Sequence, residues 1–184
     1  MSFKTAMRWL LLSAVFSVFH AHGQERGLEQ FADGPLITGY GKHAKVSRPN
    51  FLDTAEFSVA FDVAKQADGG EINRKFDSLA RFLNMHVAAG VPAQNLNLAL
   101  VVHGRASKDL LDHQAYTKAH QQENPNKALL LELIKNNVRV ILCGQSAAAY
   151  QISQSQLIEG VEIELSAMTA HALLQQQGYS VNPF

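Results

Sequence analysis

The residues best suited to chemistry stand directly after apolar stretches of the sequence. They are Asp62, His103-Gly104-Arg105, Cys143-Gly144-Gln145-Ser146 and Ser166-Ala167-Met168-Thr169. A thiolate is a strong nucleophile, an imidazole titrates near neutral pH, and a guanidinium keeps its positive charge. Cysteine, histidine and arginine side chains that meet in one cleft could therefore hold or transfer a group that carries negative charge.

Cys143 is the only cysteine of the chain, and a glycine and a helical pattern follow it at once. In that position its sulfur would lie near free backbone N–H groups at the positive end of a helix dipole, which favours thiolate over thiol. The competing interpretation is a small core residue, because cysteine is among the residue types most often buried. The sequence leaves both interpretations open.

His103 follows the neighbouring apolar run, so we expect it, Gly104 and Arg105 to face the same cleft as the cysteine. A histidine that only packs in the structure is the competing interpretation. His113 and His120 share a predicted helix, but no Cys/His spacing typical of zinc accompanies them. A solvated helix face is the preferred interpretation of these two residues.

Strand and helix patterns alternate along the chain and predict the elements that position these residues. Strands are predicted over 56–63, 96–102, 138–142 and 161–165, with a short closing strand over 179–182. Helical patterns fill the links over 72–87, 110–119, 127–134, 145–152 and 168–177. We therefore expect a three-layer α/β/α fold with a mostly parallel sheet of four or five strands. Ligands of such sheets bind beyond the carboxyl ends of the strands.

The chain divides into three predicted parts. Residues 1–23 read as a signal peptide, because Lys4 and Arg8 precede an apolar run that is too short to span a bilayer. Residues 24–54 form an irregular arm rich in Gly and Pro, and residues 55–184 form the α/β domain. We therefore expect a periplasmic protein with no membrane contact after cleavage.

The composition limits the partners. Cleavage after Gly23 would leave fourteen basic and sixteen acidic residues, a net charge of −2, so no nucleic-acid partner is expected. A lone cysteine in an oxidising compartment cannot form an internal disulfide, which makes it either a buried residue or a thiol kept for reactivity. The sequence lacks a phosphate-binding Gly-rich loop, a G-x-S-x-G elbow and a C-x-x-C pair. It predicts no cofactor and no metal site.

Five short segments of the chain, taken together and in this order, form a recognisable pattern. They are Val101-Val102-His103-Gly104, Asn124-Pro125-Asn126, Val140-Ile141-Leu142-Cys143-Gly144-Gln145-Ser146, Leu165-Ser166-Ala167-Met168-Thr169 and Gln177-Gly178-Tyr179. From about residue 57 onward, the chain thus resembles the exported branch of the DsrE-like (DsrE/DsrF/DsrH) family. The resemblance implies a parallel-sheet α/β/α fold and homo-oligomers, trimers or hexamers. From the cytoplasmic branch it implies sulfur handling through a persulfide on one cysteine, a role that falls to Cys143.

The leading hypothesis is a periplasmic sulfur carrier, or sulfurtransferase-like protein, that holds sulfur as a persulfide on Cys143 and exchanges it with a donor or acceptor protein. From their positions we expect seven further residues to help bind the transferred group: His103, Gly104, Arg105, Gly144, Gln145, Ser146 and Ser166. The alternative is a non-catalytic oligomeric module that uses the same cleft to bind a small ligand or a partner. A purely structural oligomer subunit is the third interpretation.

Overall fold

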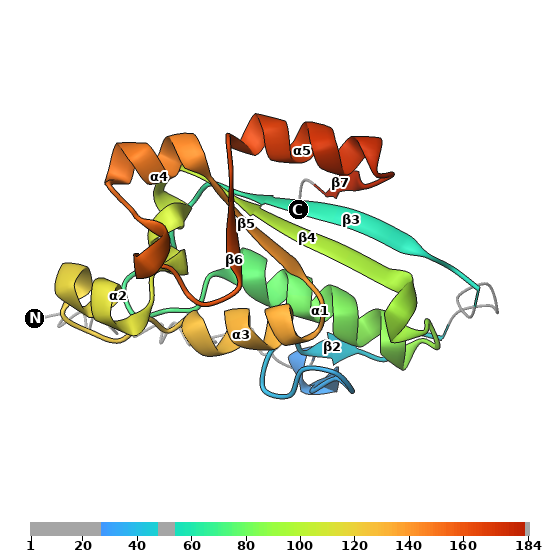
Figure 1. Ribbon diagram of the computed structural model, residues 1–184. Helices are drawn as coiled ribbons and strands as arrows, with labels where there is room; N and C mark the ends of the chain where they lie inside the picture. Colours follow the sequence, from blue (N-terminus) through green and yellow to red (C-terminus); the bar gives the residue numbers. More distant parts are fainter. Residues whose placement is uncertain (1–26, 48–53, 183–184) are drawn as a thin grey trace, which may run out of the picture.

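The computed structural model describes residues 27–47 and 54–182, and the predicted signal peptide lies outside this part of the chain (Figure 1). Its centre is a five-stranded sheet in the order β6-β5-β4-β3-β7, with every neighbouring pair parallel. The strands are β3 (Phe57–Val63), β4 (Leu96–Val102), β5 (Arg139–Cys143), β6 (Val161–Glu164) and β7 (Ser180–Asn182). The predicted α/β fold and its sheet are confirmed, and the sheet has five strands.

Helices lie on both faces of this sheet (Figure 1). The helices α1 (Arg74–Ala88) and α3 (Lys127–Lys135) cover one face, and α5 (Ala167–Gln176) covers the other. The remaining helices are α2 (His113–His120), α4 (Gly144–Tyr150) and the 3-10 turns η1 (Leu28–Gln30), η2 (Ala93–Asn95), η3 (Gly104–Leu110) and η4 (Gln154–Gln156). The face under α5 is covered only in part, and an ion pair between Arg139 and Glu162 lies beside it.

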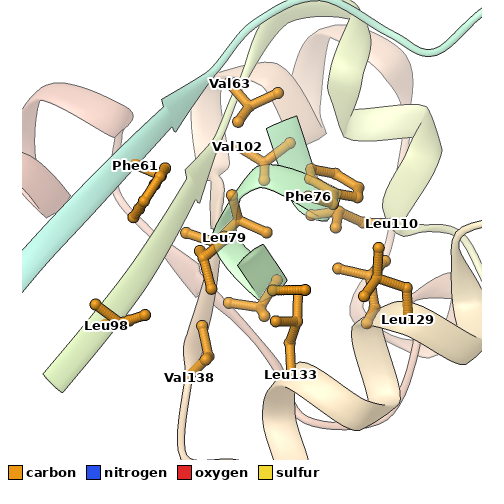
Figure 2. Packing of buried hydrophobic residues seen from close by; sticks show 14 of the residues in the cluster. Phe61, Val63, Phe76, Leu79, Leu98, Val102, Leu110, Leu129, Leu133 and Val138 are labelled. Atoms are coloured by element: carbon orange, nitrogen blue, oxygen red, sulfur yellow. The ribbon is translucent and has the colours of Figure 1, made fainter. Parts of the chain in front are cut away.

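The main core lies between the sheet and the two helices α1 and α3. Figure 2 shows Phe61 and Val102 of the sheet directed toward Phe76 and Leu79 of α1 and Leu133 of α3. All five side chains are buried, and each contributes about 1.5–3 kcal/mol relative to an exposed position. The strands are therefore fixed in register by their apolar face, which in turn fixes the direction of the side chains between these apolar positions.

The opposite face of the sheet carries the polar ends of the strands. Ala60, Val101 and Ile141 pack under α5 in a second, smaller core cluster. Because side chains alternate along a strand, Asp62 and Cys143, two residues farther along, face α5 as well. The helix therefore lies over the carboxyl ends of the strands that the sequence identified.

One predicted helix differs from the structure. The expected helix over 110–119 is divided into η3 and α2, with Leu111 and Asp112 between them. The Asp112 carboxylate accepts a hydrogen bond from the Ala115 N–H at 2.7 Å and so caps α2, while Leu111 forms an isolated bridge with Leu157. A side-chain cap at this point starts a new helix, and the apolar spacing alone did not indicate the break.

The described part of the arm packs against α1. It contains one short antiparallel pair, β1 (Phe31–Ala32) with β2 (His43–Ala44). The fully buried Asn84 of α1 accepts hydrogen bonds from the Leu36 and Ile37 N–H groups and donates to the Ile37 and Tyr40 carbonyls, at 2.9–3.1 Å. The backbone at Leu36 and Ile37 is thus held on α1 of the same domain.

None of the helices in the described part of the chain combines the length and the hydropathy that crossing a membrane requires.

Candidate functional site

Cys143 ends β5 and lies where two helices begin. The side chain is only 6% exposed. Burial is the largest influence on its thiol and would raise the pKa, but hydrogen bonds outweigh it and the pKa is lowered. The donors are the Ser146 hydroxyl and the backbone N–H groups of Ser146, Ala167 and Gln145. The second and third residues of α4 and the first residue of α5 thus stabilise the same sulfur as a thiolate.

Ser146 connects this sulfur to the loop that follows β4. Its hydroxyl oxygen accepts a hydrogen bond from the Gly104 N–H at 2.9 Å while the hydroxyl group bonds to the cysteine. Gly104 has a φ of 54°, in the left-handed region that favours glycine, and this conformation turns the chain immediately after His103. The predicted segments 103–105 and 143–146 are therefore joined by one serine hydroxyl.

Gly144 is required by close backbone packing. A Cβ atom built on this residue would lie 2.7 Å from the Glu164 carbonyl oxygen and 3.1 Å from that of Leu165. Only glycine lets α4 begin this close to the end of β6. Its part in the site is to bring the N–H groups that follow it within reach of the sulfur.

Asp62 binds two imidazoles at once. Its Oδ1 lies 2.7 Å from His171 Nε2, and its Oδ2 lies 3.1 Å from His103 Nε2. Burial would raise the pKa of this carboxyl, but the hydrogen bonds from His171 and His103 outweigh it and hold the pKa below its ordinary value. Asp62 therefore remains a carboxylate and fixes both rings through the same type of nitrogen.

His103 lies between Asp62 and the thiol along the edge of the sheet. Val102 pairs with Leu142 across β4 and β5, so His103 and Cys143 are the next residues on each of these adjacent strands. Neighbouring strands are about 4.8 Å apart, and the His103 N–H still bonds to the Val63 carbonyl at 2.9 Å. The three side chains thus follow one another on β3, β4 and β5.

The other predicted residues have different surroundings. Arg105 is exposed and has no hydrogen bond or ion pair with the described residues. Gln145 is also exposed, and its side-chain amide donates to the Leu165 carbonyl at 3.2 Å. The Ser166 hydroxyl caps α5 by accepting the Thr169 N–H at 3.0 Å. Arg105 therefore makes no polar contact at the site, while Gln145 and Ser166 hold the two helix starts that face the thiol.

Sequence reasoning missed His171 and the Ala167 N–H. Both belong to α5, one turn apart, and no apolar run ends at His171 to mark it. His120 also differs from the expectation of a solvated face, because its Nε2 is buried without a hydrogen-bond partner and its ring packs on Tyr116. Nowhere in residues 27–47 and 54–182 do three His, Cys, Asp or Glu side chains gather so as to hold a metal ion.

A cavity of about 530 Å³ lies elsewhere, between β2 and the C-terminal end of α1. His43, Met85 and His86 are among its lining residues. None of the side chains around Cys143 lines this cavity, so it is separate from the site at the strand ends.

The comparisons with known proteins agree with this fold. The DsrE/DsrF-like family model matches residues 59–183. The solved structure of MTH1491 from Methanobacterium thermoautotrophicum, a protein of unknown function, is 15% identical, with a TM-score of 0.54. The ychN protein from E. coli is 27% identical, with a TM-score of 0.47. Each likeness covers 70% of this chain and 100% of the other chain.

No curated protein sequence matches the chain. At 15% identity the likeness to the archaeal structure supports the fold alone. The family model, in contrast, includes β4, β5 and α5 and therefore every residue placed around the thiol. Since the match extends over more than half of the sequence, the chain belongs to the DsrE/DsrF-like family.

Proposed function

We propose that the protein is a sulfur carrier, or sulfurtransferase-like protein, that holds sulfur as a persulfide on Cys143. The observation that carries the proposal is the set of hydrogen bonds that lowers the pKa of a thiol in spite of its burial. A thiolate is the form that attacks sulfur, and the N–H groups that favour it also stabilise it when it leaves. Proteins of this family are commonly sulfur-relay proteins, which agrees with that chemistry.

The proposed reaction moves one sulfur atom between thiols. The Cys143 thiolate attacks the outer sulfur of a donor persulfide R–S–SH, a bond to that sulfur forms, and the donor's S–S bond breaks to release R–S⁻. With thiosulfate as donor, the same attack releases sulfite. An acceptor thiolate then attacks the outer sulfur of the Cys143 persulfide and releases the Cys143 thiolate. No external oxidant or reductant is needed, because the sulfane sulfur is passed on unchanged in oxidation level.

We further propose that this carrier acts in the periplasm as a homo-oligomer, a trimer or hexamer, with a donor or acceptor protein. Exposed apolar side chains around the start of α5 support the binding of another protein chain there. Leu165 is 67% exposed and Met168 is 80% exposed, although both adjoin the residues that surround the thiol. Large apolar side chains clustered at a surface are typical of sites where another chain binds.

The test is the intact mass of the mature protein, isolated without reductant, before and after treatment with thiosulfate or glutathione persulfide. We expect a gain of one sulfur atom that dithiothreitol removes. The matched control is Cys143→Ser, which removes the only thiol of the chain and should show no gain. A wild-type protein that gains no sulfur from either donor contradicts the proposal.

The second candidate is a non-catalytic module that binds a small ligand or a partner. The burial of Cys143 favours it, because a thiol with 6% of its surface exposed admits reagents poorly. In that case Cys143→Ser would leave ligand binding intact, and the thiol would be alkylated no faster than free cysteine near neutral pH. The two candidates are therefore separated by the same variant.

A further inference from the structure

We propose that His103 carries the proton for sulfur transfer at Cys143, and that Asp62 and His171 are positioning residues that hold its ring. The inference rests on the proposed function, because it assigns the proton that the leaving thiolate must receive. It concerns a cluster of one carboxylate and two imidazoles, of which the apolar patterns of the sequence indicated Asp62 and His103 but not His171.

The cluster is built from three separate elements. Asp62 is on β3, His103 follows β4, and His171 is in the second turn of α5. Each oxygen of the single carboxylate faces one Nε2 atom, at 2.7 Å for His171 and 3.1 Å for His103. A carboxylate accepts hydrogen bonds and cannot donate them, so both rings present N–H at Nε2. This arrangement fixes the ring orientation and leaves Nδ1 of each imidazole as the nitrogen available for other work.

The course of α5 places the cluster beside the thiol. The Ala167 N–H at the start of this helix bonds to Cys143, and His171, four residues later on the same helix face, bonds to Asp62. The helix therefore crosses from β5 to β3, and His103 on the strand between them lies under it. Cys143 and Asp62 are in this way the two neighbours of His103 on the same face of the sheet.

The two histidines are not equivalent. The His171 side chain is 18% exposed, and its Nδ1 is buried without a hydrogen-bond partner. The His103 side chain is 32% exposed, and its Nδ1 has no hydrogen bond within the described part of the chain. A proton can therefore pass between His103 Nδ1 and a molecule at the surface, whereas the same nitrogen of His171 is enclosed. This difference assigns proton transfer to His103 and positioning to His171.

The two half-reactions then balance. In loading, the Cys143 thiolate takes the outer sulfur of R–S–SH, and protonated His103 gives its Nδ1 proton to the departing R–S⁻. The products are the Cys143 persulfide, R–SH and neutral His103. In unloading, neutral His103 takes the proton of an acceptor thiol, whose sulfur attacks the outer sulfur of the persulfide and releases the Cys143 thiolate. The cycle ends with protonated His103, the form that loading requires.

The experiment measures the rate at which Cys143 takes sulfur from glutathione persulfide, with His103→Gln as the variant. We expect loading to slow roughly 10²-fold, the lower end of the usual contribution of general acid–base catalysis. Alkylation by iodoacetamide is the internal control, because iodide leaves without a proton and its rate should remain that of the wild type. His171→Gln and Asp62→Asn should slow loading less than His103→Gln, since the ring is misplaced but still present.

The pH profile separates a proton carrier from a structural residue. The titratable or charged groups around His103 are Asp62 on β3, His171 on α5, Cys143 on β5 and Arg105 in its own loop. We expect the wild-type loading rate to fall on the alkaline side of its pH profile, because loading needs a proton donor beside the leaving thiolate, with this limb absent from His103→Gln but retained in His171→Gln and Asp62→Asn. A retained limb in His103→Gln overturns the inference.

The outcomes also distinguish this inference from the function on which it rests. If the wild type takes sulfur and His103→Gln takes it equally fast, His103 is no proton carrier although the sulfur-carrier function holds. If the wild type takes no sulfur from glutathione persulfide or thiosulfate, the proposed function fails first. Should His103→Gln fail to fold, by circular dichroism, the limbs of the Asp62→Asn and His171→Gln profiles decide, and loss of both limbs overturns the division of roles.

Discussion

Replacing Ser146 by alanine tests the physical basis of the reactive thiol. The serine hydroxyl is one of the groups whose hydrogen bonds lower the pKa of Cys143, and it also accepts the Gly104 N–H. Alanine keeps the Ser146 backbone N–H and the helix, but removes the hydroxyl. The expected effect is therefore a rise in the pKa of the thiol without loss of the fold.

The magnitude follows from the charge on the acceptor. A hydrogen bond to a charged group contributes about 1.5–3 kcal/mol, and one pKa unit corresponds to about 1.4 kcal/mol. Ser146 is only half-buried, so the lower part of that range applies, and we expect a rise of about one pKa unit. At a pH below the pKa of the Cys143 thiol in both the wild type and the variant, the fraction present as thiolate is then about tenfold lower in the variant.

The assay is the rate of Cys143 alkylation by iodoacetamide as a function of pH, followed by intact mass. The midpoint of the profile should move to higher pH in Ser146→Ala. Ser107→Ala is the matched control. The Ser107 hydroxyl lies in the same 3-10 turn as Gly104 and donates to the Gly104 carbonyl at 2.8 Å, but it does not bond to the sulfur. An unchanged midpoint in Ser146→Ala, or an equal shift in both variants, would refute the reasoning.

Two further predictions concern stability. Leu174→Ala should lower the free energy of unfolding by about 2–5 kcal/mol, because Leu174 of α5 is buried against the sheet. Leu173 is 41% exposed, so Leu173→Ala should lower it far less. Urea denaturation measures both variants, and equal effects would contradict the assigned packing of α5. Burial raises the pKa of Asp109, although the Asn73 side chain and the Ala67 N–H donate hydrogen bonds to its carboxyl group. The stability that the protonated Asp109 contributes is therefore present below the ordinary carboxyl pKa and is lost as the pH rises. The Asp109→Asn variant should therefore lose less stability than the wild type between about pH 4 and about pH 7, and an identical loss in the two proteins would contradict the sign.

Much of the fold could be predicted, because the buried strands are continuous in the sequence. The apolar runs that became β4 and β5 are long enough to be recognised, and the residues after them mark the edge of the sheet where the thiol lies. The arm was harder to predict. Its strands β1 and β2 contain two residues each, too few to show an alternation, and the buried Asn84 that holds the arm is a polar residue within an apolar helix face.

The candidate site could be predicted only where it is local in the sequence. Cys143, Gly144 and Ser146 are consecutive or nearly so, and the helix that begins there is visible in the pattern. The bond from the Ala167 N–H, and the pair that Asp62 forms with His171, depend on where α5 crosses the sheet. That crossing is decided by packing on small residues such as Ala60 and Ala99, which carry no signal of a site.

The late position of α5 gives the thiol a chemical latency during folding. Asp62 and His171 are 109 residues apart in the chain, and the strand β7, which follows α5, returns to the sheet edge beside β3, where Ser180 bonds to Ser58 across 122 residues. Until α5 docks, Cys143 lacks one of its hydrogen-bond donors and His103 lacks a fixed carboxylate. A chain in which α5 has not docked therefore holds a less stabilised thiolate, and the fully stabilised form arises with the native structure. The rate of alkylation of this one residue would serve as a direct probe of how far folding has advanced.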